Sequence, residues 1–136
     1  MKPIYFAAIA IGVATHVNAE PTQTTLADYS FNFAEVGYEI AFSGTTRNYT
    51  DALTADDYIT IRDKGYSMKT LIDNLPRRDR QGFIGFFNEN CITGFSGTPC
   101  DIHAKGEVEL DEDMQMIFRL SGVTITKSGK SWSTEQ

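Results

Sequence analysis

Polar and apolar residues alternate most regularly in the second half of the chain, between residues 101 and 110. The polar positions are Asp101, His103, Lys105, Glu107 and Glu109, and the apolar or small ones between them are Ile102, Ala104, Gly106, Val108 and Leu110. A period of two places every polar side chain on one face of a β-strand. The pattern therefore predicts a strand with one face in water and the other in the core.

A second strand is expected to return alongside the first one. Asp111, Glu112 and Asp113 are typical of the connecting turn, and the inward positions of the returning strand are Met114, Met116, Phe118 and Leu120. After Gly122 the phase of the apolar positions changes to Val123 and Ile125. A change of phase inside a strand predicts a β-bulge or a sharp bend at that point.

Shorter patterns in the first half of the chain predict further strands. Residues 36–43 alternate, with Val36, Tyr38, Ile40 and Phe42 expected inward, and residues 58–62 do the same with Ile59 and Ile61. Residues 26–33 are expected to form an earlier strand or the start of the same ribbon. Residues 44–57, which are rich in Thr, Asn and Asp, are expected to be a loop.

One short helix is expected over residues 68–75. Ser67 offers a side-chain oxygen as an N-cap, and Pro76 would end the helix. The apolar residues at helical spacing are Met68, Leu71, Ile72 and Leu75. Residues 82–87 are apolar on both faces and predict a central strand, with two glycines that permit tight curvature.

These elements predict a mainly β domain, built as a curled antiparallel sheet or a small barrel with one short helix. The order resembles the OB-fold, a five-stranded barrel with a helix between its third and fourth strands. The resemblance spans residues 36–125, and the run Lys105-Gly106-Glu107-Val108-Glu109-Leu110 is its most suggestive stretch. It implies an oligomer or a partner bound across one sheet face, with loops that set specificity.

The first nineteen residues have the pattern of a cleavable export signal. Lys2 is followed by an apolar run from Ile4 to Val17, and Val17 and Ala19 supply the side chains expected before a cut. The run is too short to span a bilayer, which takes about 20 residues. We therefore expect a signal at 1–19, one β-rich domain at 20–126 and a polar tail at 127–136, in a periplasmic or secreted protein.

The chain is acidic, with a formal net charge of −6 at pH 7. Loss of residues 1–19 removes Lys2 and no acidic residue, which makes the net charge of the remaining domain −7. A field of this sign repels nucleic acid and anionic lipid. Nucleic acid is therefore not expected as a partner, and no cofactor is expected.

Cys91 and Cys100 are the two cysteines of the chain, and both follow the predicted signal. The eight residues between them include two glycines and a proline, which favours a disulfide that closes a local loop. A redox or metal role is the alternative. Redox pairs usually have CxxC spacing, however, and structural zinc needs about four ligands.

Two sets of side chains are candidates for contacts with a ligand. Arg77, Arg78 and Arg80 form the densest basic cluster and are expected just after the helix, where they could hold a carboxylate or phosphate. Pairing with Asp79 or simple solvation is the alternative. Phe95 is expected to be exposed on the short disulfide loop, where it could stack on a ligand.

A metal is a separate candidate, because His103 is flanked by acidic residues on the wet strand face. The residues expected there are Asp101, His103, Glu107 and Glu109. The spacing of a calcium loop is absent, so an acidic solvent-exposed face is the alternative.

Two short motifs do not support an enzyme. Gly129-Lys130-Ser131 lacks the earlier glycine of a phosphate-binding loop, because position 124 is Thr. The run from Gly94 to Thr98 lacks the final glycine of a GxSxG elbow. No catalytic residue is assigned, and the expected function is a non-enzymatic binding module for a protein partner or an oligomeric ligand. The alternatives are a cation- or histidine-dependent protein and an envelope structural or inhibitory subunit.

Overall fold

The computed structural model describes residues 21–28 and 37–134. The predicted signal at 1–19, residue Val36 and most of the predicted strand at 26–33 lie outside these residues. Residues 26–28 are described and form a helical turn. The prediction of a strand is therefore wrong at these three positions.

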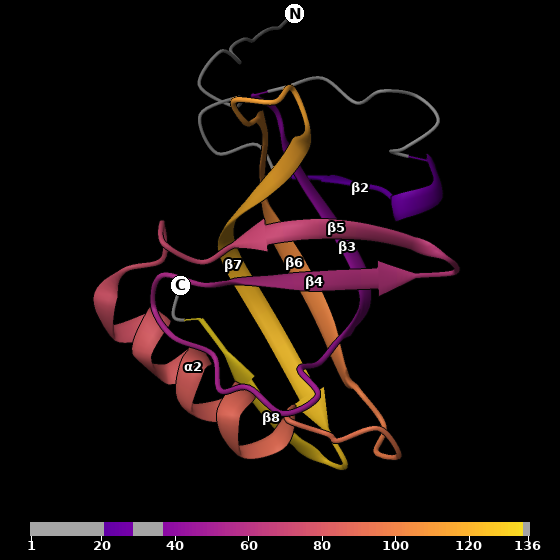
Figure 1. Ribbon diagram of the computed structural model, residues 1–136. Coiled ribbons are helices and arrows are strands. Elements are labelled where there is room, and N and C mark those ends of the chain that lie inside the picture. The colour runs from indigo at the N-terminus through magenta and orange to yellow at the C-terminus, as the bar shows by residue number, and fades with distance from the viewer. Residues whose placement is uncertain (1–20, 29–36, 135–136) are drawn as a thin grey trace, which may run out of the picture.

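Five strands close into a barrel (Figure 1). They are β3 (Glu39–Thr46), β4 (Tyr58–Asp63), β5 (Tyr66–Leu71), β6 (Cys100–Leu110) and β7 (Met116–Lys127). Strand β3 pairs antiparallel with both β4 and β6, and β7 pairs antiparallel with β6 and parallel with β5. Helix α2 (Arg77–Asn90) lies between the third and fourth of these strands in the sequence. This is the arrangement of an OB-fold barrel, and the expectation of a mainly β fold of this kind is confirmed.

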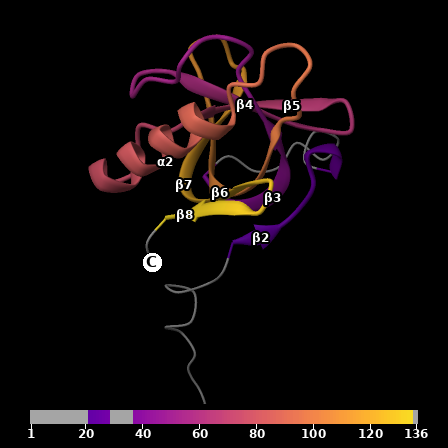
Figure 2. The same cartoon turned by 90° about the horizontal axis from the view of Figure 1, so that it is seen from below.

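Two further strands extend the sheet beyond the barrel. Strand β2 (Thr22–Gln23) pairs parallel with β3, and β8 (Lys130–Ser133) pairs antiparallel with β7. Figure 2 shows both of them at the lower side of the barrel. Within the predicted polar tail, residues 130–133 thus form a strand, in which exposed Lys and Ser residues flank the partly buried Trp132.

The predicted bend near Gly122 is confirmed. Lys105 pairs with Gly122 but Gly106 pairs with Leu120, so one residue of β7 is left without a counterpart on β6. Gly106 lies so close to the opposite backbone that a Cβ there would collide with the carbonyl oxygen of Arg119. The bulge curls these two long strands around the core.

The predicted helix at 68–75 is wrong, because residues 66–71 form strand β5. Met68 and Thr70 are buried while Ser67 and Lys69 are exposed, which is the period of a strand. The next apolar residue, Ile72, is fully buried in the connection that follows β5. Two turns of apparent helical spacing thus arise from a strand and an apolar loop.

The predicted strand at 82–87 is also wrong, because these residues lie inside α2. Phe83 and Phe87 are four residues apart, so they lie on one face of the helix, and both are fully buried. Pro76 occupies the N-cap of this helix and so precedes a helix where one was expected to end. In the described part of the chain, no helix combines the length and the apolar character needed to cross a membrane.

Two glycines of α2 predict opposite effects of the same substitution. Nothing lies within 4 Å of a Cβ at Gly85, so Gly85→Ala should raise the free energy of unfolding by about 0.5–1 kcal/mol through helix propensity. A Cβ at Gly82 would lie 2.6 Å from the ring of Trp132 on β8. Gly82→Ala should therefore lower stability. Urea unfolding of both variants tests this, and equal effects would contradict the packing of α2 on β8.

Candidate functional site

Two loops lie against each other at one end of the barrel. The first connects β3 to β4 and spans residues 47–57, and the second connects α2 to β6 and spans residues 91–99. The backbone N–H of Asn48 donates to the Cys91 carbonyl oxygen at 3.0 Å, and the N–H of Thr93 donates to the Asn48 carbonyl oxygen at 3.0 Å. The N–H of Gly94 donates to the Tyr49 carbonyl oxygen at 2.8 Å. The two loops thus form one surface.

The second loop is closed by the Cys91–Cys100 disulfide, as the cysteine spacing predicts. Both cysteines are fully buried and belong to the hydrophobic core. The loop therefore begins and ends at points fixed to the barrel, while its middle lies on the surface.

Phe95, at the middle of this loop, is 84% exposed, which confirms the expected exposure. Its ring stacks on Tyr49 of the first loop, with centroids 4.9 Å apart and planes 21° apart. The guanidinium of Arg47 lies 4.6 Å from the centre of the Tyr49 ring and donates to the Gly97 carbonyl oxygen at 3.0 Å. We call the stacked pair Phe95 and Tyr49 the aromatic platform.

The first loop is also fixed to the body of the protein. Leu53 is buried, and its backbone N–H and carbonyl both bond to the side-chain amide of Asn88 on α2, at 2.7 and 3.0 Å. Farther along, Asp57 accepts hydrogen bonds from the N–H and the hydroxyl of Thr54. The platform therefore stands on loops that are held before any ligand binds.

A hollow of about 500 Å³ opens beside the platform, between the first loop and the outer face of β4. We call it the loop groove, and its lining residues are Arg47, Asn48, Tyr49, Thr50, Asp51, Ala52, Asp57, Tyr58, Thr60 and Arg62. Tyr58 is half exposed, and the ammonium of Lys69 on β5 lies 4.5 Å from the centre of its ring. The groove thus contains an aromatic ring from the loop and another from the barrel wall.

The predicted arginine cluster lies elsewhere on the molecule. Arg77, Arg78 and Arg80 stand at the start of α2 and not after a helix, so that detail of the prediction is wrong. Phe95 follows the other end of this helix, which at 14 residues is roughly 20 Å long. The structure therefore does not bring the arginines and Phe95 into one site.

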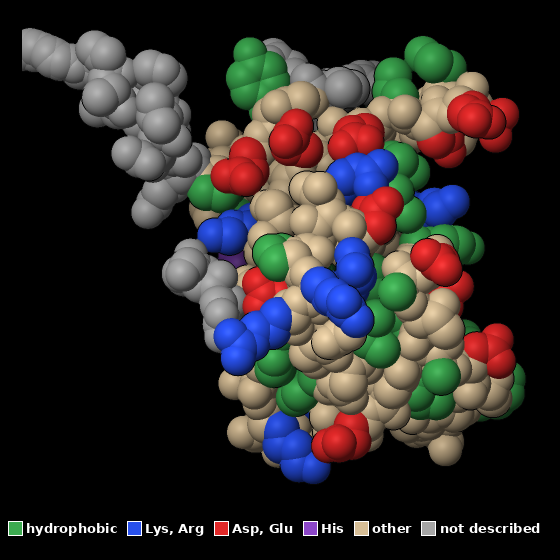
Figure 3. Space-filling view, turned by 90° about the vertical axis from the view of Figure 1, so that its left-hand side faces the viewer, with side chains coloured by type: hydrophobic (Ala, Val, Ile, Leu, Met, Phe, Trp, Pro, Cys, Tyr) green, Lys and Arg blue, Asp and Glu red, His purple; other side chains and the backbone are tan. Residues whose placement is uncertain are grey.

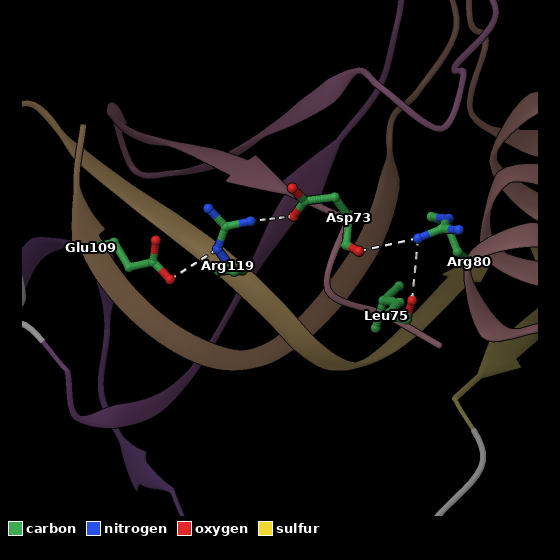
Figure 4. A network of polar contacts seen from close by, with 5 residues as sticks. All are labelled: Asp73, Leu75, Arg80, Glu109 and Arg119. Atoms are coloured by element: carbon green, nitrogen blue, oxygen red, sulfur yellow. Dashed lines mark hydrogen bonds and ion pairs between the residues drawn. The ribbon is translucent and has the colours of Figure 1, made fainter. Parts of the chain in front are cut away.

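Figure 4 shows that Arg80 is engaged within the protein. Its guanidinium donates to the carbonyl oxygens of Asp73 and Leu75, at 3.1 and 3.5 Å, and so holds the connection between β5 and α2. Arg77 and Arg78 are exposed. Their binding role stays a prediction.

The acidic strand face is partly neutralised by Arg119 on β7 (Figure 4). Its Nε donates to Glu109 at 2.8 Å, and its Nη1 pairs with Asp73. The hydrogen bond to Glu109, and then the one to Asp73, raise the pKa of the Arg119 guanidinium above its ordinary value. Glu109 is therefore already occupied by a cation of the protein itself.

The other candidate metal ligands are exposed along β6. His103 Nδ1 lies 2.7 Å from the hydroxyl of Ser43, while Asp101 and Glu107 point into solvent on the same face. Within residues 21–28 and 37–134, no three His, Cys, Asp or Glu side chains gather as a metal ion would need. His103 also borders a hollow of about 310 Å³ on the outer face of β3, β6 and β7, whose lining contains no Phe, Tyr or Trp.

The fold and these loops define an OB-fold-like barrel with a presented aromatic surface. No protein-family model matches the chain, and no curated protein is similar to it at a significant level. Among solved structures it is similar to the hypothetical protein ygiW from E. coli, with 14% identity and a TM-score of 0.45. The match covers 80% of this chain and 92% of that one. The assignment of the fold rests on the strand pairings and on the position of α2.

Proposed function

We propose that this protein is an exported, non-enzymatic binding module that holds an oligomeric ligand against the aromatic platform and the loop groove. The observation that carries the proposal is the exposure of Phe95 on a fixed support. Large apolar side chains that are held in place at the surface mark interaction sites more often than scattered ones do. A ring fixed before binding also loses little conformational freedom when a ligand arrives, which favours affinity.

The position of the groove supports the same function. In OB-fold barrels the second and third strands and the loop between the first and second strands form the usual ligand-binding face. Here that loop is residues 47–57 and those strands are β4 and β5, which supply Tyr58, Arg62 and Lys69. The platform adds a stacking surface at the edge of this face.

Export is supported by the signal pattern of residues 1–19 and by the disulfide, because disulfides persist mainly outside the reducing cytosol. A periplasmic or secreted location would place the groove in contact with envelope or extracellular polymers. Protein partners belong to the same hypothesis, because a stacked aromatic pair is also a common anchor at protein interfaces.

Thermal unfolding against a ligand panel tests the proposal. The panel contains short oligonucleotides, cell-wall fragments, peptides, calcium and zinc, and a ligand at about 100 times its Kd should add roughly 2.7 kcal/mol of stability. Phe95→Ala should weaken binding about tenfold or more, since aromatic stacking contributes about 1–3 kcal/mol. A shift in melting temperature that is unchanged in Phe95→Ala would contradict the proposed site.

Tyr38→Ala is the matched control for the loss of an exposed ring. Tyr38 was expected to face inward, but it is 63% exposed because it precedes β3 and lies beyond the paired part of the sheet. The platform loop follows the other end of that strand. An eight-residue strand, roughly 26 Å long, therefore separates the two positions. Binding should be unchanged in this variant.

A further inference from the structure

We infer that the ligand of the loop groove is an uncharged oligosaccharide. This inference rests on the proposed binding function and adds the chemical class of the ligand. It is carried by the balance of charge in the groove, by its hydrogen-bonding groups and by the position of its aromatic rings.

The charges that line the groove cancel. Arg47 and Arg62 are the two basic residues of the lining, and Asp51 and Asp57 are the two acidic ones. A site for a chain of phosphates or sulfates would be expected to have a clear excess of positive charge. A site for a polycation would have the opposite excess, so the balance favours a ligand without charge.

Two of these four charged groups are also engaged within the protein. Arg47 donates to the Gly97 carbonyl oxygen at 3.0 Å and to the Tyr49 hydroxyl at 3.3 Å. Asp57 accepts two hydrogen bonds from Thr54, at 3.0 and 2.8 Å. These hydrogen bonds show Arg47 and Asp57 shaping the loop, and they give less support to a role of either residue in attracting a charged polymer.

Lys69, whose ammonium lies 4.5 Å from the centre of the Tyr58 ring, is one basic group beside this lining, and the acidic charge of the whole chain opposes it. Figure 3 shows acidic and basic side chains interspersed over one face of the molecule. The chain as a whole has a net charge of −6. A polyanion would therefore be repelled at long range by the chain as a whole.

The lining also contains neutral polar side chains, which can donate and accept hydrogen bonds. Thr50 and Thr60 supply hydroxyl groups, which both donate and accept hydrogen bonds, and Asn48 adds its amide oxygen, while its amide nitrogen donates to the Asp51 carbonyl oxygen at 2.8 Å. A sugar hydroxyl also does both, so a polyhydroxylated ligand could satisfy this mixed set. An apolar ligand would leave these groups without partners, which costs free energy.

The rings stand where a chain of sugar units would meet flat apolar surfaces. Tyr49 and Tyr58 both line the groove. Phe95 and the Arg47 guanidinium lie against the Tyr49 ring, so the rings open to a sugar are Tyr58 and the exposed Phe95 that Tyr49 supports. A pyranose ring has apolar C–H faces and a polar rim, so it could rest on an aromatic face while its hydroxyls bond to the polar lining. The volume of about 500 Å³ is within the range of small-ligand sites, roughly 300–1,000 Å³.

Isothermal titration with three probe classes tests the assignment on the mature, oxidised protein. The probes are a panel of neutral hexasaccharides built from glucose, N-acetylglucosamine or mannose, an oligothymidylate of similar length, and an uncharged extended peptide. We expect saturable binding of a neutral hexasaccharide, with a Kd that changes less than about twofold between low and high salt. A polyanion in the same groove would lose affinity steeply as salt rises.

Two ring variants link this binding to the groove. Tyr49→Ala and Tyr58→Ala should each weaken the hexasaccharide about tenfold. Tyr58→Phe keeps the ring and should keep most of the affinity, and Tyr38→Ala should have no effect. Circular dichroism of each variant separates a loss of binding from a loss of folding.

The outcomes separate the ligand class from the binding function. Binding of oligothymidylate or of the peptide in place of every neutral hexasaccharide, with loss of that binding in Tyr49→Ala, overturns the saccharide assignment and leaves the binding module standing. Hexasaccharide binding that persists in both Tyr49→Ala and Tyr58→Ala overturns the groove as its site. Absence of binding for all three classes overturns the inference, whereas the proposed function is overturned only if the full thermal-unfolding panel also gives no shift.

Discussion

Replacing Phe118 with alanine is expected to lower the free energy of unfolding by about 3–5 kcal/mol, because its ring fills the centre of the core. Phe118 lies on β7, has no exposed surface and meets the ring of Phe42 on β3 edge-on at 4.9 Å between centroids. β3 and β7 lie on either side of β6, so the pair connects strands that do not bond to each other. The cavity left by the deleted ring would lie inside the barrel.

Urea unfolding measures this loss, and Phe95→Ala is its matched control. Phe95 is the same residue type at 84% exposure, so its truncation should change stability by no more than about 0.5 kcal/mol. A large loss is thus expected for one phenylalanine and a small one for the other. Similar losses for both would contradict the described core.

Removal of the disulfide by Cys91→Ala together with Cys100→Ala is expected to cost about 3 kcal/mol. The two cysteines are nine positions apart, and a ring of this size restricts the unfolded chain by roughly that amount in the chain-entropy model. Alanine is preferred to serine because both positions are fully buried, and a serine hydroxyl there would need a partner.

The same double variant should also weaken ligand binding, because Phe95 would stand on a loop that is no longer closed.

The loss of stability is measured by urea unfolding of the oxidised wild type, the reduced wild type and the double variant. The two disulfide-free forms should agree and lie well below the oxidised protein. An unchanged midpoint on reduction would show that the disulfide does not support this loop.

The sequence predicts the long strands well because their environment is uniform along their length. The exception is Met114, which was expected inward but is 70% exposed, because it lies in the turn before β7. One face of β6 is wet and the other is buried along nearly all of it, so the alternation from Asp101 to Glu109 follows the structure directly. The change of phase after Gly122 likewise marks the bulge, because a register shift must move the inward residues.

For β5 and α2 the sequence pattern predicts the wrong kind of secondary structure, because the burial of their residues depends on tertiary packing. Met68 and Leu75 both enter the core, but one does so from a strand and the other from a loop. Phe83 and Phe87 have helical spacing, yet Gly82 and Gly85 lower the helix propensity of the same segment. Glycine is needed at position 82 because the ring of Trp132 packs against it, and Trp132 belongs to a strand fifty residues later in the sequence.

One part of the candidate site, the exposed Phe95, could be predicted from the sequence. A short loop between two cysteines predicts an exposed Phe95, but nothing local indicates that Tyr49 and Arg47 will stand beside it. These residues lie in a polar loop some forty-six positions earlier, and the barrel alone brings the two loops together. The loop groove and the charge balance within it follow from that tertiary contact.

Chemical-shift mapping of the 15N-labelled protein during titration with a bound hexasaccharide tests the binding face most directly. We expect the largest amide shifts on residues 47–52, 58–62 and 93–97, which form the groove and the platform. Shifts concentrated around His103, Lys105 and Thr124, on the outer face of β6 and β7, would place the ligand in the hollow of about 310 Å³ on that face. That result would contradict the aromatic platform as the binding site.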